Sequence, residues 1–419
     1  MTNTNIKTNS SLSRATALPH KYVQIKLDIP LLLVTITLLI FGALMVYSAS
    51  ADFSLRVYGS MTFIFKRQIT FMLLGSISIV ALMFIDYHFL KKVSLMGMIF
   101  VILLLIYVML YAEIRHGAGR AILGGSYQPS ELAKLMTIIY LSIWLFSKKD
   151  QLSDIKFGLI PLAIMLGFIA GLIYKQPDLS AAATVIILGG IMFFLAGADL
   201  KQIILLGIVT LGASYFFIIV NPTGNERIQE YLKGLEDLRN SSYHLSRSIG
   251  AFVSGGWFGV GIGQSDTKFT GLPFPQTDSI FAVVSEETGV VGASILVIIY
   301  VVFLWRSLVI AKNAPDGLGR LLASGLGIWI TMEAFFNIGS MLGVFPIAGN
   351  SLPLISAGGS NLIATMIGIG IMFNISRQSA AKKQEDEWRL FNAVVSLRGR
   401  NGRWRVSRNR RTASSRRDT

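Results

Sequence analysis

The chain has 419 residues, of which 53% are hydrophobic and only 15% charged, and its formal net charge is +15. Soluble domains carry about 25% charged residues, so this composition excludes an ordinary soluble protein. Because there is no cysteine, disulfides, thiolate metal sites and a cysteine nucleophile are excluded too. Long apolar runs recur along the chain, which predicts an all-α polytopic membrane protein.

Ten apolar runs approach the roughly 20 residues that a helix needs to cross a bilayer. The first follows a polar N-terminal tail, residues 1–28, with Asp28 placed to cap the helix and Pro30 in its first turn. The sequence therefore predicts a ten-helix membrane domain over 29–376 and a basic tail over 377–419. The ten spans are expected at 29–49, 69–86, 94–112, 130–147, 157–174, 179–197, 201–220, 278–305, 319–345 and 358–376.

The distribution of basic residues predicts the orientation of these spans. Lysine and arginine gather in the two tails and in alternate loops, and such loops face the cytoplasm. Both termini are therefore expected inside, and the large loop 221–277 outside. The basic C-terminal tail is interpreted either as a docking segment for anionic lipid or a cytoplasmic partner, or as a solvated tail that helps to fix the topology.

The large outside loop has two distinct parts. Residues 226–240 place apolar side chains on one helical face and charge on the other, which predicts an amphipathic helix. Residues 248–263 are apolar and contain five glycines. This argues against a regular helix and favours a re-entrant segment whose backbone packs closely on another part of the protein.

Asp278 follows the loop at the outer end of the eighth span, after two prolines. A charged side chain at membrane depth is costly and marks a candidate functional site. A partly desolvated carboxylate suits a general base, but Thr277 or Asp278 capping the helix is an equally good interpretation. Glu286 lies about 12 Å further along a continuous helix, too far to act as a partner carboxylate, so Glu286 and Glu287 are interpreted as structural.

Other polar residues are expected on the same outer side. Ser130 and Glu131 are ordinary helix-start signals. Lys134 lies one turn inside the span, where an isolated charge is costly, so its ammonium should pair with Glu131, meet an anionic ligand or extend to the membrane interface. The tight turn at Lys175 and Asp178 has an ordinary structural interpretation as well. The outside basic residues suit either a pyrophosphate or the role of interfacial anchors. These are Lys66, Arg67, Arg120, Arg227, Arg247 and Lys268.

A last candidate segment, 346–362, interrupts the chain between the ninth and tenth spans. Its prolines and glycines favour irregular backbone that faces a cavity or protein, and Ser356, Ser360 and Asn361 offer hydrogen-bond donors there. A packed re-entrant turn explains it equally well. No compact cluster of metal ligands is visible in the sequence.

Several segments in this order resemble the SEDS family (shape, elongation, division and sporulation proteins). The resemblance covers about 29–376, nearly the whole membrane domain, and is closest to the division members, with the elongation members second. It rests on PQTDSIFAVVSEETGVVG, HGAGRAILGGSYQPSELAK from His116, KQPDLS from Lys175, YHLSRSIGAFVSGGWFGVGIGQS from Tyr243 and NSLPLISAGGS from Asn350.

The resemblance implies a peptidoglycan glycosyltransferase of the bacterial cytoplasmic membrane. Such an enzyme polymerises lipid II on the outer face, beside a class B penicillin-binding protein (a transpeptidase) and other divisome proteins. Asp278 matches the family's catalytic residue, and Glu131 and Lys134 match its functional positions. Further substrate-binding candidates are Arg120, Gln128, Lys175, Asp178, Arg247, Ser248, Lys268, Thr277 and Ser356. A divalent cation, Mg²⁺ or Mn²⁺, is the one cofactor considered, without assigned ligands.

The implied mechanism uses Asp278 as the base that accepts a proton from the 4-hydroxyl of the acceptor sugar. That oxygen attacks the anomeric carbon of the donor chain, and undecaprenyl pyrophosphate leaves with inversion. Two other classes of function stay open: a transporter that flips lipid II, and a non-catalytic division scaffold. The chain departs from the family pattern at Ala121, His244, Arg247, Ser279 and Ala357.

Overall fold

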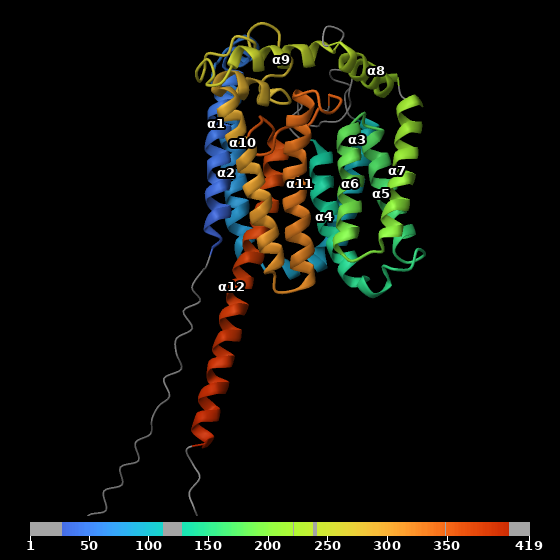
Figure 1. Ribbon diagram of the computed structural model, residues 1–419, viewed down its shortest axis with the longest axis vertical. Coiled ribbons are helices and arrows are strands. Elements are labelled where there is room, and N and C mark those ends of the chain that lie inside the picture. Colours follow the sequence, from blue (N-terminus) through green and yellow to red (C-terminus); the bar gives the residue numbers. More distant parts are fainter. Residues whose placement is uncertain (1–26, 112–127, 221, 238–240, 348, 402–419) are drawn as a thin grey trace, which may run out of the picture.

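The structure, a computed structural model, describes residues 27–111, 128–220, 222–237, 241–347 and 349–401. These residues form helices joined by turns, without any strand in the described ranges (Figure 1). The helices are α1 (Ile29–Tyr58), α2 (Phe63–Phe84), η1 (Tyr87–Phe89), α3 (Leu90–Tyr111), α4 (Pro129–Ser147), η2 (Lys149–Gln151), α5 (Leu159–Tyr174), α6 (Leu179–Leu195), α7 (Leu200–Val220), α8 (Pro222–Glu236), α9 (Tyr243–Gly255), α10 (Ile280–Lys312), α11 (Gly317–Met341) and α12 (Gly359–Asn401).

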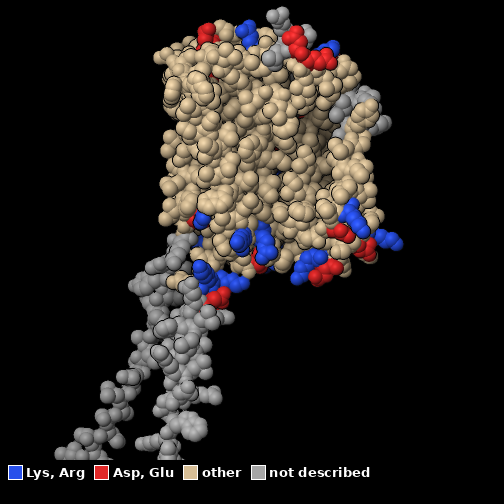
Figure 2. Space-filling model, viewed as in Figure 1, with Lys and Arg blue, Asp and Glu red and all other residues tan. Residues whose placement is uncertain are grey.

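The apolar helices confirm a multi-pass membrane protein. Seven of them, α1, α2, η1–α3, α4, α10, α11 and α12, are long and apolar enough to cross a bilayer, and α5, α6 and α7 are shorter apolar helices. The face of the molecule in Figure 2 carries its charged side chains at the two ends, with an uncharged band between them. This distribution suits a protein surrounded by lipid. The count of ten spans and their orientation stay predictions.

The two ends of the bundle carry different elements. The upper end in Figure 1 carries α8, α9 and the segment that leads into α10; the lower end carries η1 and the N-termini of α1 and α11. Between them, α11 and α12 are the most buried of the long apolar helices, and α11 contacts α4, α6, α10 and α12. The buried residues of α11 include Trp329, with 0% of its surface exposed. This helix therefore forms the centre of the packing.

The sequence prediction assumed that the eighth span is a continuous helix, but the structure shows that it is broken. Gly289, inside α10, has φ 70° and ψ −174°, a conformation essentially restricted to glycine, and it divides α10 into a short upper helix and a long lower one. Backbone groups released by the break are paired by the glycine-rich segment after α9. The four hydrogen bonds, of 2.9–3.1 Å, run from Val260 to Glu286, from Gly261 to Glu287, from Val290 to Gly256 and from Val291 to Trp257.

The glycines of this segment confirm the predicted close backbone packing. A Cβ on Gly255 would lie 2.3 Å from the Ser285 carbonyl oxygen, and one on Gly259 would lie 2.2 Å from that of Glu287. The prediction of no regular helix was wrong for 248–255, because α9 continues to Gly255. Glycine is compatible with a helix where the neighbouring backbone approaches this closely.

Other local predictions can be compared with the structure. The side chain of Asp28 accepts a hydrogen bond of 3.0 Å from the Leu31 N–H and caps α1, as predicted. The amphipathic helix is α8, which begins earlier than predicted, at Pro222. The last predicted span continues past residue 376, because α12 runs without interruption to Asn401 and projects from the lower end of the bundle (Figure 1).

Candidate functional site

Asp278 lies half-buried in a turn at the upper end of the bundle, just before α10. The residue at the N-cap position is Ser279, so the interpretation of Thr277 or Asp278 as the helix cap was wrong. The turn closes on the carbonyl of Phe274, which accepts hydrogen bonds from the backbone N–H groups of Thr277 (3.1 Å) and Ser279 (3.3 Å). Asp278 is therefore presented by a compact turn and is not used to start the helix.

A second loop supports the turn from the segment between α11 and α12. The Ser356 hydroxyl donates to the Thr277 carbonyl at 2.6 Å and accepts from the Leu352 N–H at 2.7 Å. The Ala357 N–H donates to the carbonyl of Gln276 at 2.8 Å. These contacts bring together Thr277 and Ser356, two of the predicted site residues. The hydrogen bond between them holds the backbone next to Asp278.

His244, on α9, contacts the residue after Asp278. Its Nε2 forms a short hydrogen bond with the Ser279 hydroxyl, which itself donates to the Pro273 carbonyl at 2.5 Å. The hydroxyl proton is thus committed to Pro273, so Nε2 carries the imidazole proton and donates it. Burial, together with the positive charge of Arg227, lowers the pKa of His244 below its usual 6.5. Two of the residues at which the chain departs from the family pattern are therefore hydrogen-bonded to each other.

A buried ionic cluster lies inside the bundle near the start of α4. The Lys134 ammonium pairs with Glu131 at 2.8 Å, one of the predicted outcomes, and also forms a short contact with Glu333 of α11. The Asn361 amide of α12 donates to Glu131 at 3.0 Å and to Glu333 at 3.3 Å. Only 2% of the Lys134 side chain and 1% of the Glu333 side chain are exposed.

This cluster joins three helices through one ammonium, two carboxylates and the Asn361 amide. Glu333 was missed by the sequence analysis, although a single carboxylate in the middle of an apolar span is itself a signal of a functional or paired group. Glu131 and Glu333 depend on Lys134, because removing the ammonium would leave two uncompensated charges in a dry interior. The cluster thereby fixes α4, α11 and α12 relative to one another.

Gln128 and Asp178 also meet at the upper end. The Gln128 side-chain amide donates to Asp178 at 2.7 Å, and the Ser130 hydroxyl donates to the same oxygen at 3.0 Å. The other oxygen of Asp178 caps α6 by accepting from the Ala181 N–H at 3.2 Å. Ser130 was interpreted as a helix-start residue able to cap α4; in the structure it lies inside the first turn, and Gln128 occupies the N-cap position. The structural interpretation of Asp178 is thus confirmed, and its role toward a substrate stays a prediction.

The remaining described site candidates belong neither to the Lys134 cluster nor to the Gln128–Asp178 pair. The buried ammonium of Lys268 contacts Glu287 at 2.7 Å and the Gly263 carbonyl at 2.8 Å. Arg247 donates to the Tyr243 hydroxyl at 3.2 Å, and the buried Ser248 donates to the His244 carbonyl at 3.0 Å. Lys175 is exposed at the end of α5. Arg120 lies outside the described residues.

Glu286 and Glu287 have the structural roles that were predicted. Glu286 accepts from the Asp266 N–H at 3.2 Å and the Thr267 N–H at 3.4 Å, and Glu287 pairs with Lys268. These bonds hold the loop 263–268 on the upper half of α10. Within the described ranges no group of three or more His, Asp or Glu is arranged to hold a metal ion, so we derive no step through a metal.

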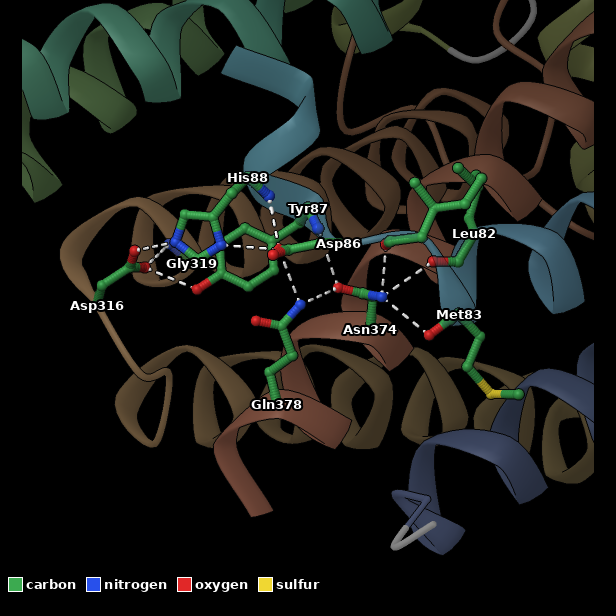
Figure 3. Close-up of polar contacts among 10 residues, drawn as sticks. Leu82, Met83, Asp86, Tyr87, His88, Asp316, Gly319, Asn374 and Gln378 are labelled. Carbon is green, nitrogen blue, oxygen red and sulfur yellow. Dashed lines mark hydrogen bonds and ion pairs between the residues drawn. The ribbon is translucent and has the colours of Figure 1, made fainter. Parts of the chain in front are cut away.

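A separate polar network closes the lower end of the bundle (Figure 3). His88 has a carboxylate at each ring nitrogen, Asp86 at 2.7 Å and Asp316 at 2.8 Å. Asp316 also caps α11 through the Gly319 N–H at 2.7 Å. The amide of Asn374 in α12 donates to three backbone carbonyls at the end of α2, those of Leu82, Met83 and Ile85. The sequence analysis did not single out these residues.

Comparison with known proteins identifies the family. The Cell cycle protein family, which comprises FtsW, RodA and SpoVE, matches residues 29–381. The chain belongs to this family. Among its relatives, Stage V sporulation protein E of Bacillus subtilis is 35% identical over 84% of this chain and 97% of its own length. A probable peptidoglycan glycosyltransferase FtsW of Geobacter sp. strain M18 is 33% identical over 83% of this chain and 96% of its own.

Solved structures of the family share the fold. One, described as a peptidoglycan synthase complex that coordinates polymerisation and crosslinking, matches with a TM-score of 0.70 and 25% identity, over 85% of this chain and 99% of that one. The rod shape determining protein RodA of Thermus thermophilus matches with a TM-score of 0.63 and 25% identity, over 85% of this chain and 98% of its own. The membrane domain predicted from the sequence thus has the family's fold.

Proposed function

We propose that this protein is a peptidoglycan glycosyltransferase that polymerises lipid II during septal cell-wall synthesis. Membership of a family with relatives named probable peptidoglycan glycosyltransferase FtsW supports the reaction. The turn at Asp278 is the observation that supports a catalytic role for this residue. Its carboxylate is held at the upper end of the bundle and does not occupy the N-cap position of α10. On this proposal the upper end faces outside the cytoplasmic membrane.

Asp278 acts as the general base on the 4-hydroxyl of the acceptor lipid II. The new bond joins that oxygen to the anomeric carbon of the donor chain, the bond from this carbon to the pyrophosphate breaks, and the configuration inverts. A base positioned in this way contributes about 10²–10⁴-fold to the rate. The leaving pyrophosphate needs positive charge. Of the predicted cations, Lys175 is exposed, whereas the ammonium groups of Lys134 and Lys268 are already paired.

The partner on this proposal is a class B penicillin-binding protein that crosslinks the new strands, within the divisome. The structural match to a peptidoglycan synthase complex supports an assembly of this kind. Assistance by Mg²⁺ or Mn²⁺ at the leaving pyrophosphate stays a prediction. A role in division, and not in elongation or sporulation, predicts that cells depleted of the protein grow as filaments with unfinished septa.

The test is polymerisation of labelled lipid II by the purified protein together with its transpeptidase partner. Asp278→Asn should lose at least about 100-fold in glycan formation while keeping its thermal unfolding midpoint. Asp266→Asn is the matched control, because Asp266 is an exposed aspartate in the same loop, and it should keep wild-type activity. Equal product from Asp278→Asn and wild type would sink the assignment of the base.

A lipid II transporter is the second candidate, and the buried Glu131–Lys134–Glu333 cluster is the observation that favours it. Polar groups inside the bundle are what a path across the membrane requires. Vesicles that contain the purified protein would distinguish the two functions. Movement of labelled lipid II between leaflets without any polymer supports transport, whereas polymer without movement supports the glycosyltransferase.

A further inference from the structure

We propose that Asn337 is a positioning residue that holds Asp278 in place for proton transfer; this inference rests on the proposed function. Asn337 lies on α11 and is fully buried, with 0% of its surface exposed. Its amide nitrogen donates to the backbone carbonyl of Asp278 at 2.7 Å and to that of Asn350 at 2.6 Å. One side chain therefore joins the turn that carries the base to the loop that supports it.

The direction of the Asn337 amide is fixed by its partners. Both partners are carbonyl oxygens, which only accept hydrogen bonds, so the NH₂ group must face them and the amide oxygen must point away. That oxygen, Oδ1, is buried and lacks a hydrogen-bond partner among the described residues. A buried unpaired acceptor is destabilising. The Asn337 amide thus leaves one acceptor unpaired while it bonds two carbonyls that come from different segments.

Asn337 connects the Asp278 turn to the helix that carries part of the buried ionic cluster. Glu333, one helical turn before Asn337 on the same face of α11, belongs to the buried cluster with Lys134. The Ser356 hydroxyl adds a second tie to the adjacent residue, Thr277. The turn is thus held to α11 directly and through the supporting loop. A catalytic base held by packed helices keeps its geometry, and a displacement of about 1 Å can cost about 100-fold in rate.

The lower end of the bundle provides a matched control residue. Asn374 of α12 is also fully buried, and its amide nitrogen donates to backbone carbonyls of Leu82, Met83 and Ile85 at 2.6–3.1 Å (Figure 3). The two asparagines have the same burial and the same kind of bond, but only Asn337 contacts the Asp278 turn. A merely structural role of Asn337 predicts that neither substitution changes kcat below its unfolding midpoint.

The experiment compares Asn337→Ala and Asn374→Ala in lipid II polymerisation and in thermal unfolding, with the full chain and its partner. We expect both variants to lower the unfolding midpoint. Below that midpoint, Asn337→Ala should lose at least about 10-fold in kcat with KM changed less than about twofold, because geometry of the base affects the transition state and not ground-state binding. Asn374→Ala should keep kcat within about twofold of wild type.

Ser356→Ala is the second variant, used also if Asn337→Ala fails to fold. It should lower kcat in the same way but less, while Ser307→Ala, which removes a buried hydroxyl that donates to the Phe303 carbonyl of its own helix, should not. Wild-type kcat in Asn337→Ala or, if that variant is unfolded, in Ser356→Ala overturns the inference, as does an equal loss in Asn374→Ala. A wild-type protein that makes no glycan refutes the proposed function instead.

Discussion

The two ends of the bundle use similar polar residues in different ways. At the lower end, His88 lies between the carboxylates of Asp86 and Asp316, and Asn374 bonds the backbone at the end of α2, so that α2, α11 and α12 are joined. At the upper end, the side chains of Asn337 and Ser356 hold backbone carbonyls of the turn, and Asp278 itself stays half-buried. The lower arrangement closes helices together, whereas the upper one holds a carboxylate in position.

The pKa shifts at the lower end agree with this distinction. Burial alone would raise the pKa of Asp86, but hydrogen bonds from Gln378 and His88 outweigh burial and lower the pKa to about 2. Burial is likewise outweighed at Asp316 by bonds from Gly319, His88 and Tyr87, which lower its pKa. Carboxylates held in this way bind a proton poorly and suit a structural role. A general base must instead accept a proton during the reaction.

The largest effect is expected in the buried ionic cluster near the start of α4. Lys134→Ala leaves Glu131 and Glu333 without their ammonium in a buried site, and breaking a buried pair in this way costs about 3–5 kcal/mol. The unfolding midpoint in detergent should fall strongly, and activity with it. Lys175→Ala, at an exposed lysine, is the control and should leave the midpoint unchanged. An unchanged midpoint in Lys134→Ala would show that the cluster does not hold the helices.

The break in α10 gives the second largest effect. Gly289→Ala forces a side chain into a conformation with φ 70° and places its Cβ 2.4 Å from the Trp257 carbonyl oxygen. We expect a loss of roughly 3 kcal/mol and a parallel loss of glycan formation, because the upper helix that follows Asp278 must shift.

Gly59 provides a comparison for this change, at a ψ of 9° that other residues adopt at a modest cost. It also has φ 70°, but no atom lies within 4 Å of a Cβ built there. Gly59→Ala should therefore cost only about 1 kcal/mol of backbone strain and leave activity intact. Equal losses in the two variants would contradict a special requirement for glycine at position 289.

A smaller effect is expected from opening the lower end. His88→Ala removes the group between Asp86 and Asp316, and because 39% of the His88 side chain is exposed, solvent screening reduces the loss to about 1 kcal/mol. The unfolding midpoint should fall slightly while kcat in lipid II polymerisation stays at the wild-type value. A loss of kcat without a change of midpoint would show that the lower end contributes to catalysis and would contradict its purely structural role.

The smallest effect is a pH dependence at the upper end. The pKa of His244 lies below its unfolded value near 6.5, so the folded state binds fewer protons than the unfolded state on acidification. The stability that depends on neutral His244 is complete above about pH 6.5 and is lost as the pH falls below this value toward the lower pKa of the folded state. His244→Gln should flatten the fall in midpoint between about pH 7 and pH 5.5. The same slope in both proteins would contradict the shift.

The sequence by itself determined which segments are apolar helices and where the polar candidates lie. Apolar length and helix-start residues are properties of contiguous residues, so the positions of the spans, the Asp28 cap and the helix of α8 were predictable. Asp278 was found in the same way, as a carboxylate beside an apolar run. Family motifs strengthened that choice.

Only the tertiary structure decided which partners these residues have. Lys134 meets Glu333 across 199 residues, and Asn337 reaches Asp278 across 59, so that neither contact leaves a local signal in the sequence. The break at Gly289 depends on backbone that approaches from another loop. The turn closed on the Phe274 carbonyl leaves Ser279 at the N-cap position, for which Thr277 or Asp278 had been an interpretation. Local composition fixes where a helix lies in the chain, but the folded packing selects the hydrogen-bond partners that give each polar residue its role.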